Sequence, residues 1–473
     1  MPDTLRIALA SFNPRMAETE ANAARLRALR AQAAGEGADL LLAPLHALSG
    51  AVPAALAADP AFAEACEAAL AALAAEPGPA LILGAPWRDG PRLHDALHLL
   101  EGGAIRARRA AHEPRPGFDP GPVPGPVAFR GARLGLMAGA DWRQPATPET
   151  LAETGAELLV ALDALPFERG GEERVLQAAL SRVVENDLPL ILLNRLGAEE
   201  EAAHDGAALI LNADRSPALR LPPFAETLAV TEWTRAEGAW RCTPQPRPPA
   251  MGEEEALWRA LLLALRDHAA RHAPAGILLP LRAGPEAALT AALATDAFAA
   301  EALHPLLLEA EATPLAQRLG LEPRPLALGP AATALAAALG ATPPPDPLHR
   351  LALDSLALAG NLLPLTETPS DCPSAFAPLR HLTGAERQAL AAWRNAHHPA
   401  GLLGPPAPGL PLPPASPAPQ AGQAPRLTPW QSLAHADYKR RRLPPGLNPA
   451  PRAFGGDRGH ILGHRNPDEA PAP

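Results

Sequence analysis

Few residues of this chain could carry out covalent or proton-transfer chemistry. It holds three cysteines among 473 residues, and all but one of its 41 Lys and Arg residues are arginines. A cysteine thiolate is a nucleophile, and a lysine amine can act in proton transfer or covalent catalysis. Arginine keeps its proton at any accessible pH, so it cannot replace lysine in those roles. A mechanism that needs a lysine must therefore use Lys439 or do without one.

The cysteines are Cys66, Cys242 and Cys372. Their spacing fits neither a disulfide framework nor a zinc site. Cys66 lies in a predicted helix, Cys242 follows a predicted edge segment, and Cys372 precedes a proline. We therefore interpret all three as small buried or incidental thiols rather than as catalytic nucleophiles.

Histidines four residues apart can share one face of an element and bind zinc. The sequence has three such pairs: His94/His98, His268/His272 and His460/His464. No pair has an evident acidic third ligand, so we interpret each as part of a solvated face and predict no metal site.

Composition narrows the classes of partner. The net charge is −10, and the only block of basic residues is Lys439–Arg442, which leaves no electrostatic footprint for nucleic acid or an anionic membrane. Residues 1–13 read as a strand rather than a signal peptide. The long uncharged stretches are too rich in Ala, Gly and Pro to span a bilayer. These features predict a soluble, cytoplasmic protein of two or three domains.

The elements that would position a site begin with alternating strands and helices, and strands alone follow. Apolar strands are predicted at residues 5–11, 39–43, 80–83, 94–100, 133–138, 157–162, 188–194, 206–212, 218–221 and 227–233, with helices at 17–35 and 61–76. A mixed sandwich with outer helices fits this order better than one parallel sheet. We assign residues 1–245 to this first domain.

The αβ pattern restarts after residue 250. Helices at 253–272 and 286–295 alternate with strands at 276–281 and 304–308, which predicts a doubly wound sheet over residues 251–400. Residues 401–429 form a Pro-rich segment that we interpret as an extended linker, with a polyproline docking motif as the alternative. A short basic tail, residues 430–473, follows.

Several motifs match a known family in order and spacing. They are Leu5–Asn13, Pro44–Gly50, Gly135–Asp141, Pro166–Gly170, His204–Ala207, Tyr438–Gly446 and Arg452–Arg458. Over nearly its whole length the chain resembles glutamine-dependent NAD+ synthetase. The resemblance implies an α/β protein with an N-terminal α-β-β-α, nitrilase-like (carbon–nitrogen hydrolase) sandwich, followed by a shortened, Rossmann-like doubly wound synthetase domain.

The resemblance also implies where an amidase site would lie. In the resembled domain a Cys attacks the glutamine amide, a Glu is the base and a Lys stabilises the oxyanion, three roles that amide hydrolysis needs. The corresponding positions here are Gly139, Leu45 and Ala110. His46 and His112 lie close by and could move protons, but a base without a nucleophile achieves little.

The phosphate loop of the resembled synthetase domain is altered as well. In its place stand Arg282, Ala283, Gly284, Pro285, Glu286 and Ala287. Pro285 removes one N–H donor and both serine hydroxyls are gone, although Arg282 could still pair with a phosphate. The later motif is changed too, at residues 366–371. Lys439, Arg440 and Arg441 of the tail are either contacts for an anionic ligand or partner, or a solvated basic segment.

Three functions remain open at this stage. The first, which we favour, is a catalytically degenerate scaffold or regulatory pseudoenzyme that needs no cofactor. The second is an NAD+ synthase that uses glutamine, ATP and deamido-NAD+ through other residues, and the third is a nucleotide-sensing module. We expect a homo-oligomer, or a hetero-oligomer with an intact NAD+ synthetase.

Overall fold

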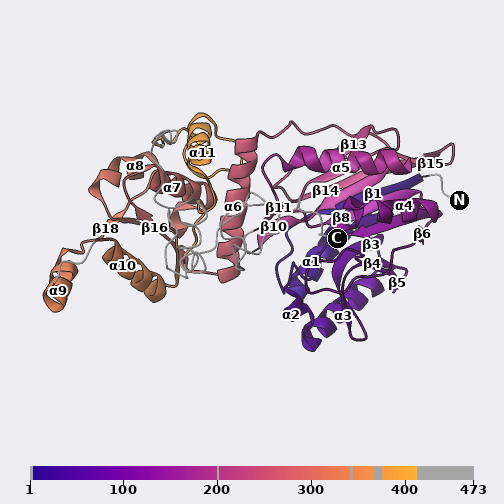
Figure 1. Ribbon diagram of the computed structural model, residues 1–473, viewed down its shortest axis with the longest axis horizontal. Helices are drawn as coiled ribbons and strands as arrows, with labels where there is room; N and C mark the ends of the chain where they lie inside the picture. The colour runs from indigo at the N-terminus through magenta and orange to yellow at the C-terminus, as the bar shows by residue number, and fades with distance from the viewer. Residues whose placement is uncertain (1–3, 200–201, 341–344, 367–374, 413–473) are drawn as a thin grey trace, which may run out of the picture. The chain divides into compact units, whose positions relative to one another are not determined.

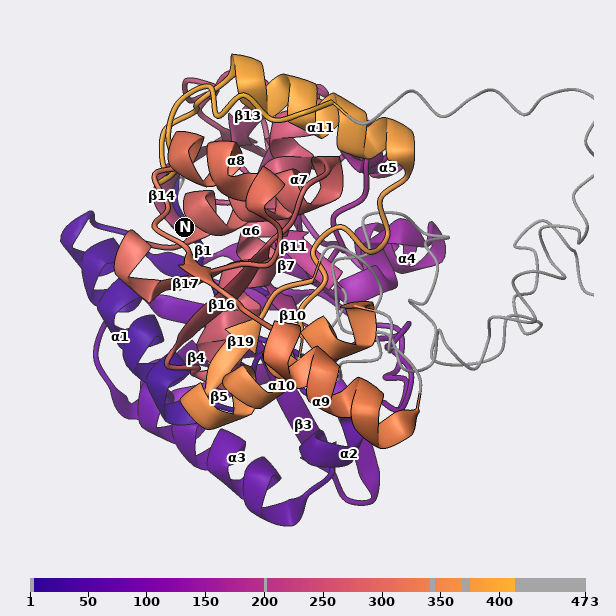
Figure 2. The ribbon, with the colours of Figure 1, turned by 90° about the vertical axis from the view of Figure 1, so that its left-hand side faces the viewer.

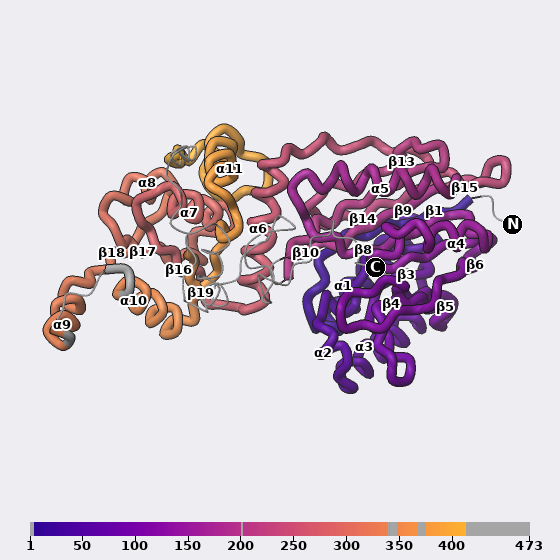
Figure 3. The backbone as a smooth tube through the Cα atoms, viewed as in Figure 1, coloured from indigo at the N-terminus to yellow at the C-terminus, as the bar shows by residue number. Residues whose placement is uncertain are grey.

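The computed structural model describes residues 4–199, 202–340, 345–366 and 375–412. The chain folds as two compact units, one up to Met251 and one from Gly252, apart from residues 200–202. Each unit has its own sheets and helices (Figures 1 and 3).

Two sheets form the centre of the first unit. One has the order β15 (Ala239–Cys242), β14 (Thr227–Ala236), β1 (Thr4–Ser11), β2 (Leu40–Leu42), β3 (Ala80–Asp89), β4 (Arg92–Glu101), β5 (Ala104–Ala110). The other has the order β13 (Pro217–Arg220), β12 (Ala208–Leu211), β9 (Leu190–Asn194), β8 (Leu158–Asp163), β7 (Ala132–Ala138), β6 (Val127–Phe129). A short separate sheet pairs β10 (Leu196–Glu199) with β11 (Ala202–Asp205).

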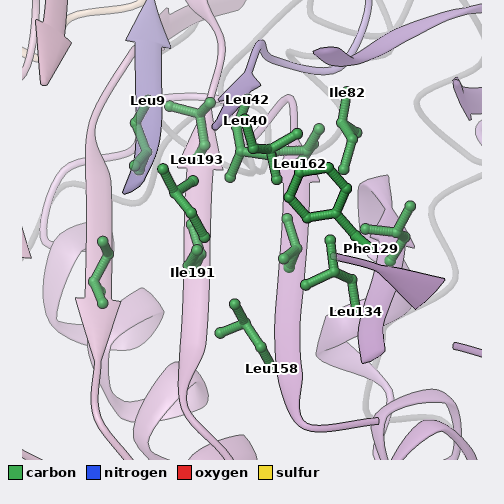
Figure 4. Packing of buried hydrophobic residues seen from close by; sticks show 14 of the residues in the cluster. Leu9, Leu40, Leu42, Ile82, Phe129, Leu134, Leu158, Leu162, Ile191 and Leu193 are labelled. Atoms are coloured by element: carbon green, nitrogen blue, oxygen red, sulfur yellow. The ribbon is translucent and has the colours of Figure 1, made fainter. Parts of the chain in front are cut away.

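The alternation of side chains along each strand divides the core into layers. In β1, Leu5, Ile7 and Leu9 face the other sheet, whereas Ala8 and Ala10 face outward to the helices. Between the sheets lie leucines and isoleucines of both (Figure 4): Leu9, Leu40, Leu42, Ile82, Leu158, Leu162, Ile191 and Leu193. Each such side chain stabilises the fold by roughly 1.5–3 kcal/mol when fully buried.

Helices cover both outer faces. Against the first sheet pack α1 (Thr19–Gly35) and α3 (Pro60–Ala75), with the short α2 (Ala54–Ala57) beside α3. Against the second sheet pack α4 (Ala146–Glu153) and α5 (Gly171–Asn186). The predicted α-β-β-α sandwich is confirmed.

The second unit is built on a parallel sheet in the order β18 (Arg324–Pro325), β17 (Leu303–Leu307), β16 (Gly276–Leu281), β19 (Leu362–Pro364). Its helices are α6 (Glu253–His272), α7 (Pro285–Ala297), α8 (Thr313–Arg318), α9 (Gly329–Leu339), α10 (Pro345–Gly360) and α11 (Gly384–Ala396). Figures 1 and 2 show α7, α8 and α11 on one side of the sheet and α10 on the other. The predicted doubly wound arrangement is confirmed.

A buried ion pair fastens residues 401–410 to this unit. Arg394 of α11 donates from Nε and Nη2 to the carboxylate of Asp296 on α7, at 2.7 and 2.9 Å. Arg394 also donates to the carbonyl of Pro405, and Asn395 exchanges two hydrogen bonds with the backbone of Leu410. The predicted linker is therefore wrong for residues 402–410, whose backbone is bonded into the second unit.

The histidine pairs differ from their predicted surroundings. His94 and His98 on β4 are buried, and the ring of His98 lies 3.2 Å from the carbonyl of Ala85, so the predicted solvated face is wrong for this pair. His268 is half-buried, with its ring against Phe376 and His272. The sequence alone could not place His94 and His98, because one face of a strand can lie against either a core or solvent.

No helix among the described residues is both long and apolar enough to cross a membrane.

Candidate functional site

A buried carboxylate organises the turn that follows β7. Asp141 lies in a short 3-10 helix, Gly139–Arg143, and is 1% exposed. Its Oδ1 accepts hydrogen bonds from the backbone N–H groups of His112 and Glu113, and its Oδ2 accepts one from Ala138. Burial raises the pKa of this carboxyl above its usual value, and the hydrogen bonds from the three N–H groups offset part of that rise. Asp141 thus ties the turn at Gly139 to the segment that follows β5.

The structure places two of the predicted catalytic positions, Gly139 and Leu45, against each other, and the third, Ala110, just before the segment that Asp141 holds. Gly139 adopts φ +58°, and a side-chain carbon built on it would lie 3.5 Å from Cδ2 of Leu45. Ala110, the last residue of β5, is packed against Gly121, where an added Cβ would come within 2.6 Å of the Ala110 Cβ. Leu45 and Ala110 are buried. The three positions are therefore occupied by two aliphatic residues and a glycine, and none of them supplies a nucleophile, base or cation.

The two cysteines that the structure describes do not fill this gap. Cys66 is buried on α3 and Cys242 ends β15, where its backbone pairs with the side chain of Asn212. Burial raises the pKa of both thiols to about 12. Because the thiolate is the reactive form, neither is an activated nucleophile. Both fit the predicted role of buried structural thiols.

A cluster of buried polar residues lies beside Leu45. We call it the Arg195 cluster, and its members are the buried His46, Asp95, Arg195, Glu199 and His204 together with the half-buried Arg115. Arg115 pairs with Asp95 at 2.6 Å, and Arg195 pairs with Glu199 at 2.7 Å. Nε2 of His46 lies 3.3 Å from Oδ1 of Asp95, but it is poorly aligned for a hydrogen bond.

The charges of the cluster act on one another. Burial lowers the pKa of His46, Asp95 opposes that effect, and Arg115 and Arg195 add to it. Burial together with Arg195 lowers the pKa of His204 to about 3. Both imidazoles are therefore neutral at pH 7. His46 was singled out from the sequence, but Asp95, Arg195 and Glu199 were not.

The altered phosphate loop lies in the second unit, between β16 and α7. Gly284 has φ +122°, a conformation that favours glycine, and Pro285 begins the helix. The backbone N–H of Ala283 donates to Oε2 of Glu309 at 2.8 Å, and Glu286 in the first helical turn pairs with Arg387 at 3.5 Å. Two carboxylates thus lie at the positive end of α7, where a phosphate would otherwise be favoured.

A cavity of about 270 Å³ adjoins this loop. It is lined by Arg282, Gly284 and Arg318, and also by Glu311 and Pro411. Ligand pockets usually measure roughly 300–1,000 Å³, so this one is small for a nucleotide.

Other sequence candidates are outside the described residues. These are Cys372, the His460/His464 pair, the motif at 367–371 and the basic residues Lys439, Arg440 and Arg441. Within the described ranges no group of three or more His, Cys, Asp or Glu side chains is placed to hold a metal ion.

Known proteins resemble this chain in sequence and in fold. Residues 6–241 match the carbon-nitrogen hydrolase family. The glutamine-dependent NAD(+) synthetase of Rhodobacter capsulatus is 34% identical over 339 residues, which cover 68% of this chain and 61% of that protein. That of Acinetobacter baylyi is 24% identical and is matched over 62% of its length. The chain thus spans about three fifths of the length of these relatives.

A solved structure extends the likeness to both units at the level of the fold. Glutamine-dependent NAD+ synthetase from Acinetobacter baumannii, in complex with ADP, superposes with a TM-score of 0.76 at 20% identity. The match covers 85% of this chain and 84% of that chain.

The role of Asp141 can be measured by substitution. Asp141→Ala leaves three backbone N–H groups, of buried Ala138 and part-buried His112 and Glu113, without an acceptor, and we expect the free energy of unfolding to fall by roughly 2–4 kcal/mol in urea denaturation. Asp141→Asn keeps one acceptor oxygen and should cost less. Asp89→Ala, at an exposed strand end, is the control and should change little. An Asp141→Ala protein as stable as the unsubstituted chain would contradict the assignment.

Proposed function

Because the chain belongs to the glutamine-dependent NAD+ synthetase family, with a carbon–nitrogen hydrolase domain at residues 6–241, we propose that it is a member without catalysis that acts as a scaffold or regulatory subunit. The carrying observation is that Leu45, Ala110 and Gly139 stand at the three corresponding positions, with Leu45 against Gly139 and with Asp141 joining the Gly139 turn to the segment after Ala110.

Hydrolysis of an unactivated amide requires a nucleophile, a proton acceptor and a group that stabilises the oxyanion. The side chains of Leu45, Ala110 and Gly139 are an isobutyl group, a methyl group and a hydrogen, which can fill none of these roles. His46 could accept a proton, but its Nε2 lies against the carboxylate of Asp95 rather than beside a nucleophile. In subtilisin, removal of the catalytic triad costs about a millionfold in rate.

Nucleotide activation meets an electrostatic obstacle in the second unit. A phosphate at the start of α7 would have to displace the carboxylate of Glu309 from the Ala283 N–H and approach Glu286. Like charges a few ångströms apart repel, and Pro285 offers no N–H in return. These contacts support loss of the ATP-dependent step.

An assembly role requires a surface, and α5 offers one. Leu176, Leu180 and Val184 follow one another at intervals of four residues, and Val184 is 45% exposed. Leu176 and Leu180 are half-buried, and Leu180 packs against the core, so Val184 is the exposed end of this row. An exposed apolar side chain is an aggregation liability, and we propose that a second copy or an intact synthetase covers it. The resemblance implies association through the amidase-like domain, which favours this helix-bearing unit. We place the protein in the cytoplasm with its proposed partner.

The loss of both reactions can be tested with the purified chain. With glutamine it should release no ammonia above a blank. With deamido-NAD+, ATP and free ammonia, which bypasses the amidase step, it should form no NAD+. The Rhodobacter capsulatus relative is the positive control. Turnover in either assay would contradict the proposal, and micromolar binding of ATP without turnover would favour the nucleotide-sensing function instead.

The assembly can be tested by size-exclusion chromatography with light scattering. We expect a mass of at least two chains, or a complex when an intact synthetase is added, and Val184→Glu should dissociate it by placing a charge in the interface. Leu358→Glu is the matched control, because Leu358 is an exposed leucine of the second unit, 80% exposed. A monomer that ignores the synthetase would reject the scaffold role. Dissociation by Leu358→Glu alone would move the interface away from α5.

A further inference from the structure

One buried arginine of the first unit has side-chain N–H groups with no hydrogen-bond acceptor among the described residues. Arg195 is 0% exposed and directly follows β9. Its Nη1 donates to Glu199 at 2.7 Å, but its Nε and Nη2 have no hydrogen-bond partner among the described residues. A buried guanidinium N–H without an acceptor destabilises the folded state, which indicates that these N–H groups bind an acceptor from outside the chain.

The free atoms are those that bind a carboxylate side-on. Nε and one terminal nitrogen of a guanidinium form a planar fork that donates two parallel hydrogen bonds to one carboxylate. The same chain uses this fork twice: Arg394 donates from Nε and Nη2 to Asp296, and Arg115 donates from Nε and Nη2 to Asp95. In Arg195 the equivalent pair of atoms is open.

Arg195 follows a strand end near that of Gly139. β7 and β9 flank β8 in one parallel sheet, so Gly139 and Arg195 follow neighbouring strand ends at the same edge. With strands 4.7–4.9 Å apart, the two residues are about 10 Å from each other. His46, adjacent to Leu45, is also in the cluster, and Nδ1 of its buried ring has no hydrogen-bond partner.

We propose that the Arg195 cluster is a binding site for a small carboxylate, held by the Nε/Nη2 fork of Arg195 and by His46. The ligand class follows from the donors: two parallel N–H groups match two carboxylate oxygens, whereas a neutral amide offers one acceptor. The site is independent of catalysis and would be present whether or not the chain turns over glutamine.

Binding of a carboxylate at this site should be coupled to the uptake of a proton. The pairs Arg115–Asp95 and Arg195–Glu199 cancel, and His46 and His204 are neutral at pH 7. A carboxylate would therefore bring a net negative charge into a buried neutral cluster. Protonation of His46, which faces Asp95, Arg115, Arg195, Glu199 and His204, restores neutrality, so the affinity should fall as pH rises from 6 to 8.

Calorimetry with the full chain tests the site, with sodium formate and sodium acetate as probes because the fork is buried. We expect one acid to bind per chain, at least tenfold more tightly than acetamide, and more tightly at pH 6 than at pH 8. Arg195→Lys keeps a cation beside Glu199 but lacks the fork, so its affinity should fall at least tenfold. Arg241→Met, on an exposed arginine of the same unit, is the control and should bind as the unsubstituted chain does.

Three outcomes would overturn the proposal. They are no binding of either acid at 100 mM, equal binding of acetamide, or equal affinity in the Arg195→Lys chain. Circular dichroism of the Arg195→Lys chain shows whether it is folded. If it is not, a crystal of the unsubstituted chain soaked in formate decides: density bridging Nε and Nη2 supports the site, and a lone water there rejects it.

Discussion

The candidate site of the first unit depends on one interaction, the acceptance of three backbone N–H groups by the buried carboxylate of Asp141. It joins the end of β7 to the segment after β5, two parts of the chain that belong to different sheets. The contact of Leu45 with the Gly139 turn adds the end of β2. None of these contacts involves the side chain of a reacting group. Under the proposed function, the backbone of an amidase site would persist here without its chemistry.

In the second unit too, carboxylates serve the chain's own structure. Asp296 accepts from Trp258 and from both fork nitrogens of Arg394, and so holds α6, α7 and α11 together. Glu309 accepts from the phosphate-loop position Ala283. The first contact is buried and stabilises the fold, whereas the second occupies a donor that a nucleotide would need. In both units, buried or loop-bound carboxylates are thus satisfied by groups of the chain itself.

Much of the fold was predictable because its periodicities are clear. The predicted helix at 253–272 and strand at 276–281 coincide with α6 and β16, and the alternation in residues 5–11 predicted β1. β5 escaped prediction because its sequence carries three arginines, and β10 and β11 because acidic residues surround them. The site positions Leu45, Ala110 and Gly139 could be located from motif order. The contact of Leu45 with the Gly139 turn needed the structure.

The Arg195 cluster could not be predicted, for a physical reason. Arg195 and Glu199 are four residues apart, a spacing typical of an exposed pair on a helix, but here they flank and end a buried strand. Burial of the pair, and of His46 against Asp95, depends on sheet packing that sequence spacing does not encode. The segment after residue 401 is similar, since composition suggested a linker and Arg394 and Asn395 decided otherwise.

The central claim is that the hydrolase unit has no activated nucleophile, and covalent labelling tests it most directly. A diazoketone analogue of glutamine alkylates a thiolate that sits where the amide would bind, so the protein can be incubated with it and weighed by intact-mass spectrometry. We expect an unchanged mass, whereas an intact synthetase incubated in parallel should be labelled. A single stoichiometric adduct, mapped by peptide digestion to Cys66, Cys242 or Cys372 and prevented by glutamine, would contradict it.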